Sequence, residues 1–382
     1  MSRRLVLLAA LILALAGAAW AAGPPAPGED GRLSLLSHAP STPETPELAT
    51  PEAVLAAHRA GDVRGPAPLA GYFTAHWFVA DLPDAAEPLA VAIWQALIAQ
   101  ADLWVFEGDR LVQHRRVGVS VDAASAAPTF AAGFALRVPP GGGGGRTLVL
   151  RVEPLMFLGT DVELVTEARL RRVAALRSML FPAVLGLFLG VAVLHVVLGV
   201  RFGDWRNGLF AGVLAITFLD WFLWLGGPQA LGVATSRDVG FAVVAGSTYA
   251  HTLALSLLFA CIFADPLRRR RKAIAALAVV FAGYVIFPLF PETDAGRHLV
   301  ATMVLMLTQI AVIAAMAGPA LAARAPGTRC ALMGSVVKVL QSVMAFAPMA
   351  LPGMDAVYTA VAAEVGHFDS GAIVLALAAF AM

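Results

Sequence analysis

Several ionisable residues lie inside long apolar stretches of the sequence, where groups of this kind are unusual. They are His195, Asp220, His251 and Lys338. An ionisable group within a bilayer is costly and generally faces the interior of a helix bundle. We therefore expect these side chains to join helices through hydrogen bonds, to take part in a switching or proton-linked step, or to line a transport path.

Asp220 has the clearest need for a partner among them. It lies in TFLDWFLW, and the residues three and four positions after it, Leu223 and Trp224, are apolar. A charged carboxylate facing lipid at this depth costs about 2.5–3.5 kcal/mol. We expect its partner to come from another helix, with His251 as the first candidate and Lys338 as the second.

Tryptophans in the N-terminal half are candidates for binding a ligand: Trp77, Trp94 and Trp104. The face of an aromatic ring suits an amphipathic ligand such as a sugar, but tryptophan is also a common core residue. The chain contains no HExxH, GxSxG or phosphate-loop motif. Its two cysteines, Cys261 and Cys330, lie apart in apolar stretches. The sequence therefore predicts no catalytic residue, no metal site and no cofactor.

The composition of the chain indicates that membrane-spanning helices carry the ionisable residues. The chain is 59% hydrophobic and 14% charged, whereas a soluble domain carries about 25% charged residues. A formal net charge of +1 argues against nucleic acid as a partner, because such proteins need a basic surface. Apolar segments at 178–200, 207–226, 239–263, 273–290, 298–322 and 329–351 approach the ~20 residues of a membrane span. A seventh apolar run covers 370–382, and the bundle as a whole is predicted at 178–382.

The region before these spans divides into three parts. Residues 1–21 have the basic, apolar and small-residue order of a signal peptide. Residues 22–68 are rich in Pro, Ser and Thr and indicate a leader or linker, with a weak helix from about Pro51 to Ala60. Residues 69–168 contain short β-branched and aromatic segments separated by Pro, Gly and Asp, which predicts an antiparallel, jelly-roll-like sandwich.

The distribution of Arg and Lys predicts the orientation in the membrane. The loops after the first, third and fifth predicted spans carry more cations than the opposite side, so the sandwich is expected outside the cytoplasm. The stretch FADPLRRRRKAIAAL then supplies a cytoplasmic anchor that favours anionic lipid. Its cations are Arg268, Arg269, Arg270, Arg271 and Lys272. We expect a multi-pass protein of the bacterial inner membrane with an extracytoplasmic N-terminal domain.

The order of parts resembles the bacterial seven-transmembrane receptors with diverse intracellular signalling modules, over roughly residues 70–382. The similar stretches are GYFTAHWFVADLPD, ADLWVFEGDRLVQHRRVG and LRVPPGGGGGRTLVLRVEP in the sandwich, and LFLGVAVLHVVLGVRFGDWRNGLFAGVLAITFLDWFLW and GAIVLALAAF in the bundle. The resemblance implies a sensor whose outer domain, similar to carbohydrate-binding modules, binds a small ligand. It also implies a homodimer and a cytoplasmic output, such as a cyclase or kinase, beyond residue 382 or on a partner protein.

The leading hypothesis is therefore a non-catalytic receptor module that binds a small, carbohydrate-like ligand and signals through its helices. A transporter or channel with an exported accessory domain is the alternative. It would need matched halves with interrupted helices, and the prolines within the predicted spans do not form such a pattern. An intramembrane enzyme is a further rival, and it would need polar residues converging on one open cavity.

Overall fold

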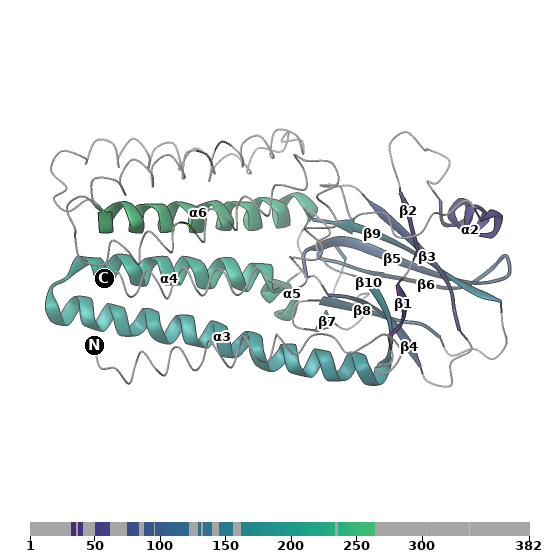
Figure 1. The fold of residues 1–382 in the computed structure, drawn as a ribbon, viewed down its shortest axis with the longest axis horizontal. Helices are drawn as coiled ribbons and strands as arrows, with labels where there is room; N and C mark the ends of the chain where they lie inside the picture. Colours follow the sequence, from purple (N-terminus) through teal and green to yellow (C-terminus); the bar gives the residue numbers. More distant parts are fainter. Residues whose placement is uncertain are drawn as a thin grey trace.

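The computed structural model covers residues 1–382. The structure describes residues 32–35, 37–40, 50–61, 75–83, 88–94, 96–121, 129–130, 133–139, 145–155, 162–233 and 236–263, with isolated positions at 304, 307 and 336. Figure 1 shows a β domain at one end of the molecule and long helices running away from it.

Among the described residues, the strands form two five-stranded antiparallel sheets. Sheet I has the order β1-β10-β4-β8-β7, and sheet II has the order β2-β3-β9-β5-β6. The strands of sheet I are β1 (Arg32–Leu35), β4 (Leu89–Ile93), β7 (Thr129–Phe130), β8 (Gly133–Arg137) and β10 (Val162–Thr166). Those of sheet II are β2 (Ser37–Pro40), β3 (His76–Asp81), β5 (Ile98–Glu107), β6 (Arg110–Val117) and β9 (Arg146–Pro154).

One apolar core holds the two sheets face to face. Val91 and Leu136 from sheet I pack in the same buried cluster as Leu103, Leu148 and Leu150 from sheet II. These residues occupy alternate positions along their strands, as expected where one face of each strand is buried. The structure thus confirms an antiparallel sandwich followed by helices.

The sandwich starts earlier in the chain than the sequence predicts. Strand β1 pairs with β10 of sheet I, and β2 pairs with β3 of sheet II, although both lie in the expected leader. The leader therefore supplies an edge strand to each sheet. The weak helix expected near residue 51 is also present, as α2 (Pro51–Ala60), with Thr50 as its N-cap and Gly61 at its C-terminal end.

Helices occur where the first three spans are predicted. They are α3 (Glu167–Phe202), α4 (Trp205–Trp224), the short α5 (Gly227–Ala230) and α6 (Arg237–Phe263). Within the described part of the chain, α3 and α4 are long and apolar enough to cross a membrane. The expected spans at 273–290, 298–322, 329–351 and 370–382 lie outside the described residues, apart from the three isolated helical positions.

Helix α3 begins directly after strand β10, with no linker between them. Thr166, the last residue of β10, is its N-cap and accepts a hydrogen bond from the Arg169 backbone N–H. The helix has 36 residues, which at about 1.5 Å per residue makes it about 54 Å long. One continuous helix, which contains Pro182, thus joins the sandwich to the apolar helices (Figure 1).

Candidate functional site

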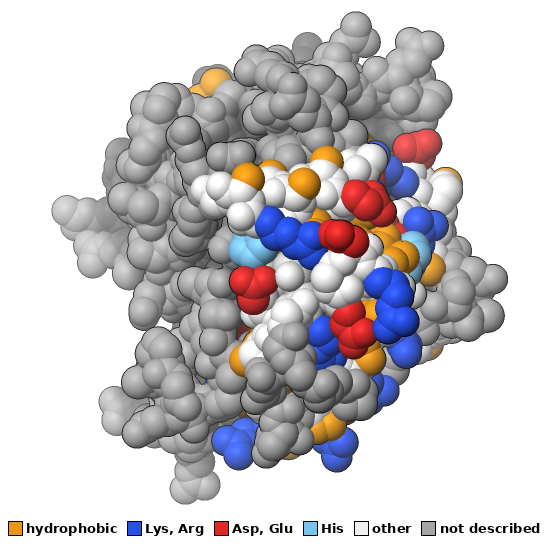
Figure 2. Space-filling view, turned by 90° about the vertical axis from the view of Figure 1, so that its right-hand side faces the viewer, with side chains coloured by type: hydrophobic (Ala, Val, Ile, Leu, Met, Phe, Trp, Pro, Cys, Tyr) orange, Lys and Arg blue, Asp and Glu red, His pale blue; other side chains and the backbone are white. Residues whose placement is uncertain are grey.

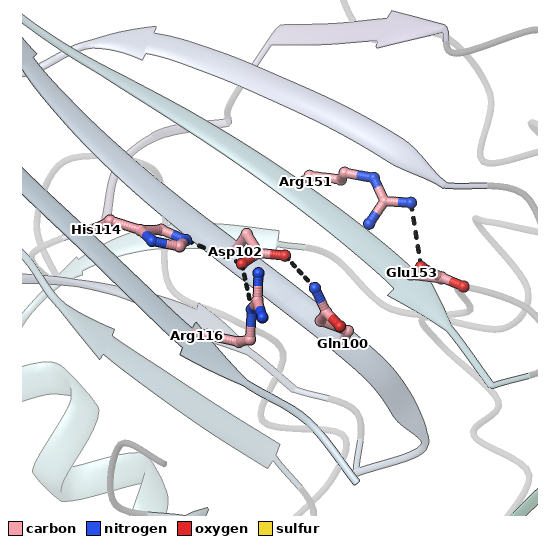
Figure 3. A network of polar contacts seen from close by, with 6 residues as sticks. All are labelled: Gln100, Asp102, His114, Arg116, Arg151 and Glu153. Carbon is pink, nitrogen blue, oxygen red and sulfur yellow. Dashed lines mark hydrogen bonds and ion pairs between the residues drawn. The ribbon is translucent and has the colours of Figure 1, made fainter. Parts of the chain in front are cut away.

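The outer face of sheet II carries a polar network on strands β5, β6 and β9 (Figure 3). Asp102 on β5 lies directly opposite Arg116 on β6 and Arg151 on β9. Directly opposed residues in antiparallel strands point to the same face, so the three form one row across the sheet. Gln100 and Glu153 are also opposite each other, two positions along from Asp102 and Arg151 on the same face.

Asp102 is the centre of this network. Its side chain is only 3% exposed. One carboxylate oxygen accepts hydrogen bonds from Arg116 Nε at 2.7 Å and contacts His114 Nε2 at 2.9 Å. The other accepts one from Gln100 Nε2. A buried carboxylate thus holds two partly exposed basic side chains in place (Figure 3).

The pKa of the Asp102 carboxyl reflects two opposing effects. Burial raises the pKa, because it disfavours the charged form. The hydrogen bonds from Gln100, Arg116 and His114, together with the positive charge of Arg116, outweigh burial and bring the pKa below its ordinary value. The network is therefore assembled around an ionised carboxylate.

Glu153 connects the network to a helix. It accepts a hydrogen bond from Arg151 Nη2 at 3.1 Å, and its other carboxylate oxygen pairs with Arg237. Arg237 is the first residue of α6. The Glu153 side chain is 17% exposed and that of Arg237 is 41% exposed, so this bridge between sandwich and helix is only partly shielded from water.

An aromatic stack lies beside the polar row and includes two of the three tryptophans predicted to bind a ligand. Trp104 packs on Trp77 with ring centroids 5.7 Å apart, and on His114 with centroids 5.1 Å apart. Strands β3 and β6, which carry these two partners, lie on opposite sides of β5. Both faces of the Trp104 ring are therefore in contact with other rings, which argues against a sugar stacking there.

Helix α2 covers part of the same face. Val54 and Leu55 of α2 pack against Trp77, Phe106 and Val149. Trp77 is consequently only 2% exposed, so it belongs to a core under α2 and is not a surface for ligand stacking.

Polar side-chain contacts fasten α2 to strand β3 and to the turn between β5 and β6. His58 Nε2 lies 3.2 Å from Asp81, and Arg59 pairs with Asp109. Figure 2, which views this end of the molecule, shows basic and acidic side chains interleaved among apolar ones. This end of the molecule is therefore a mixed surface with no extended patch of one sign among the described residues.

Trp94 lies away from the other two tryptophans. It follows β4 of sheet I, is 9% exposed, and donates a hydrogen bond from Nε1 to Glu163 at 3.0 Å. Arg177 of α3 donates to the Trp94 carbonyl at 3.1 Å and lies 4.8 Å from the centroid of its ring. Trp94 therefore fastens α3 to sheet I, and the three tryptophans do not share a binding surface.

The sandwich also contacts the helices through an apolar cluster. Leu97, Ala99 and Leu155 of the sandwich pack with Leu223 of α4 and Val244 of α6. All of these residues are at least nine-tenths buried. This cluster, the Glu153–Arg237 pair and the continuous helix α3 together form the junction between sandwich and helices.

A second polar cluster lies between α4 and α6 and confirms the expected contact of Asp220 with His251. His251 Nδ1 lies 3.1 Å from one Asp220 oxygen. The other oxygen accepts hydrogen bonds from Ser247 Oγ at 2.7 Å and Thr248 Oγ1 at 3.0 Å. Trp224 Nε1 donates to the same Thr248 hydroxyl at 3.0 Å. The carboxylate is therefore held between two helices by donors from α6.

Of the remaining predicted residues, His195 contacts a neighbouring helix, and the others lie outside the described residues. His195 Nδ1 lies 2.8 Å from Asn207 Oδ1, and the His195 ring packs edge-on against Phe210 at 4.6 Å. These contacts join the end of α3 to the start of α4, far from Asp220. Lys338 and the basic run at 268–272 lie outside the described residues.

The Asp102 network was not predicted from the sequence, although a signal for it exists. Gln100, Asp102 and Trp104 alternate with apolar residues along β5, whereas His114 and Arg116 lie within the continuous polar run QHRR of β6. Polar residues at every second position usually mark a solvated strand face. The sequence contains nothing to indicate that these particular side chains would converge, because convergence depends on strand order and register.

The arrangement suits binding more than it suits chemistry on a substrate. The network presents guanidinium and imidazole groups in fixed positions, and no group of three or more metal-ligating side chains occurs among the described residues. No known family model and no curated protein matches this chain.

Proposed function

We propose that this protein is a membrane sensor, in which the exported sandwich receives a small ligand and the helices carry the resulting change across the membrane. The observation that supports this proposal is the direct junction between the sandwich and the helices. A domain tethered by a flexible linker would not transmit a small displacement, whereas packed elements with discrete contacts can do so.

Helix α6 provides the route that we propose for the signal. Its first residue, Arg237, pairs with Glu153 on the sandwich. Further along the same helix, Ser247, Thr248 and His251 hold Asp220 of α4. A shift of α6 at its start would therefore strain the buried polar contacts between α4 and α6.

The remaining features of the proposal rest on the sequence. We place the protein in the bacterial inner membrane as a seven-helix, multi-pass homodimer, with the sandwich outside the cytoplasm. The basic run at 268–272 anchors the cytoplasmic side. We propose that the helices pass the signal to a cytoplasmic signalling protein or domain.

Hydrogen exchange of the full chain in lipid nanodiscs tests this proposal. Glu153→Gln removes the charge that holds Arg237 while it keeps the size of the side chain. Loss of a partly shielded ion pair of about 1 kcal/mol corresponds to about fivefold faster opening. We expect this acceleration in α6 between residues 244 and 251.

Glu107→Gln is the matched control, because Glu107 pairs with Arg110 on an exposed part of the sandwich. This variant should leave exchange in α6 unchanged. Equal exchange in α6 for Glu153→Gln and the unaltered protein would show that the sandwich and helices act independently, and it would refute the proposal.

A further inference from the structure

We infer that the outer face of sheet II binds a small oxyanion, a carboxylate or phosphate group, and that the bound anion competes with Glu153 for Arg151. This inference deepens the proposed function by naming the class of ligand and the first step of its signal. It also replaces the carbohydrate ring expected from the tryptophans, whose faces are covered by other rings or by packed side chains.

The charges on this face favour an anion. Arg116, Arg151 and Arg237 carry positive charge, whereas Asp102 and Glu153 carry negative charge, so the fixed charges sum to one positive unit. The Arg116 side chain is 50% exposed and that of Arg151 is 30% exposed. Both guanidinium groups are thus accessible from solvent beside the partly exposed His114.

Each arginine retains donors for a ligand. Arg116 contacts Asp102 through Nε, and Arg151 donates to Glu153 through Nη2. A guanidinium group has five N–H donors in a fixed fork, which matches the geometry of carboxylate and phosphate. The remaining donors on both side chains can therefore bind oxygen atoms of one small ligand.

The sheet sets the spacing of the two arginines. Arg151 and Arg116 lie on either side of Asp102 in one cross-strand row. Adjacent strands are about 4.8 Å apart, so the backbones of the two arginines are about 10 Å apart. Asp102 is buried beneath them and already contacts three side chains, so it orients Arg116 and His114 rather than occupying the position of the ligand.

The position of Glu153 links binding to the helices. Arg151 and Arg237 share this one carboxylate. An anion that draws Arg151 away leaves Glu153 with Arg237 as its remaining basic partner in this network. The bridge to α6 therefore changes when the site is filled.

Titration calorimetry of the full chain in nanodiscs tests the site directly. The probes are inorganic phosphate and malonate, each at constant ionic strength maintained with sodium chloride. Saturable binding of phosphate alone, malonate alone or both supports the inference and distinguishes the two kinds of oxyanion. Replacing one charged donor typically weakens binding about ten- to hundredfold, and we expect this loss for both Arg116→Gln and Arg151→Gln.

Arg115→Gln is the matched control. Arg115 lies between His114 and Arg116 on β6, so its side chain points to the opposite face of the strand. This variant removes the same charge and should bind both probes as the unaltered protein does. The inference fails if neither anion gives saturable heat, or if Arg115→Gln weakens binding as much as Arg116→Gln. Calorimetry measures anion binding alone. Either failure would therefore refute the anion site without refuting the proposed coupling of sandwich and helices, which hydrogen exchange tests separately.

Discussion

At the scale of single residues, buried carboxylates organise both polar clusters of the molecule. Asp102 in the sandwich and Asp220 between the helices are 2% and 5% exposed, respectively. Each is surrounded by side-chain donors from a neighbouring strand or helix. Removing such a carboxylate leaves several donors without their acceptor, which is more costly than the loss of one exposed ion pair.

Asp102 should make the sandwich sensitive to acid. Its pKa is lowered in the folded protein, so folding favours the ionised form. The resulting stability is complete above the unfolded pKa of about 3.9 and is lost as the pH falls through the folded value. The difference in melting temperature between the unaltered protein and Asp102→Asn should therefore shrink below about pH 4.

The control for this measurement is Asp109→Asn, since the Asp109 side chain is 94% exposed. Its effect on the melting temperature should be small throughout the same pH range. At pH 7 we expect Asp102→Asn to cost about 1–3 kcal/mol, because an amide is a poorer acceptor for the surrounding donors. A difference between Asp102→Asn and the unaltered protein that persists at the lowest pH would contradict the role given to the ionised carboxylate.

The contact of Asp220 with His251 should appear as an energetic coupling. We expect the stability losses of Asp220→Leu and His251→Leu to differ from additivity by about 0.5–3 kcal/mol in the double variant, because residues in contact share an interaction. Thermal unfolding of the three purified variants measures this quantity. Strict additivity would mean that the two side chains do not interact in the membrane.

The two clusters differ in how far the sequence predicts them. The partner of Asp220 was predictable, because a carboxylate within TFLDWFLW needs a donor from another helix and His251 lies at a suitable depth. The convergence of His114 and Arg116 on Asp102 was not predictable, because each residue alone resembles an ordinary solvated side chain. The packing of Trp77 and His114 on Trp104 could not be predicted either, because it depends on the order of the strands in the sheet.

At the scale of elements, the turn after α4 lies directly against the sandwich. Gly226 has a φ of +77°, and a Cβ at this position would lie 2.8 Å from Ala96 Cβ in the sandwich. Gly232, after α5, has a similar φ of +74° but no atom within 4 Å of the same position. Comparing an alanine substitution at Gly226 with one at Gly232 therefore distinguishes the cost of backbone strain from the cost of the clash with Ala96.

Gly226→Ala should therefore destabilise the protein more than Gly232→Ala does. Both substitutions incur about 1–2 kcal/mol for placing a side chain in a left-handed conformation. Only Gly226→Ala must also displace Ala96, so it should lower the melting temperature further. Equal melting temperatures for the two variants would indicate that Ala96 and the turn are not packed together.

The sequence predicts the long elements better than the short ones. Helices α3, α4 and α6 follow from apolar runs of sufficient length, and α2 follows from its Thr-Pro start and its Gly61 end. Strands β1 and β2 have four residues each, RLSL and SHAP. RLSL alternates polar and apolar residues but is too short for this to be a reliable signal, and SHAP does not alternate. Both segments become strands because the edges of two existing sheets can pair with them.

At the scale of the whole molecule, the orientation in the membrane is open to a direct test. We predict that Ser236, just before α6, lies outside the cytoplasm, and that Lys272 in the basic run lies inside. An impermeant thiol reagent applied to intact cells should modify an introduced Ser236→Cys and spare Lys272→Cys, with Cys261 and Cys330 replaced by alanine. The reverse pattern would invert the orientation.

We propose that packed contacts hold the sandwich in one position on the helices. Spin labels at Leu111→Cys, on strand β6, and Val239→Cys, near the start of α6, report this directly, because both sites are at least 46% exposed. For the full chain in nanodiscs, with the native cysteines replaced, we predict a single narrow distribution of distances between the labels. Glu153→Gln should broaden this distribution. A broad or multiple distribution without that substitution would contradict the account, because it would mean that the sandwich moves freely relative to α6.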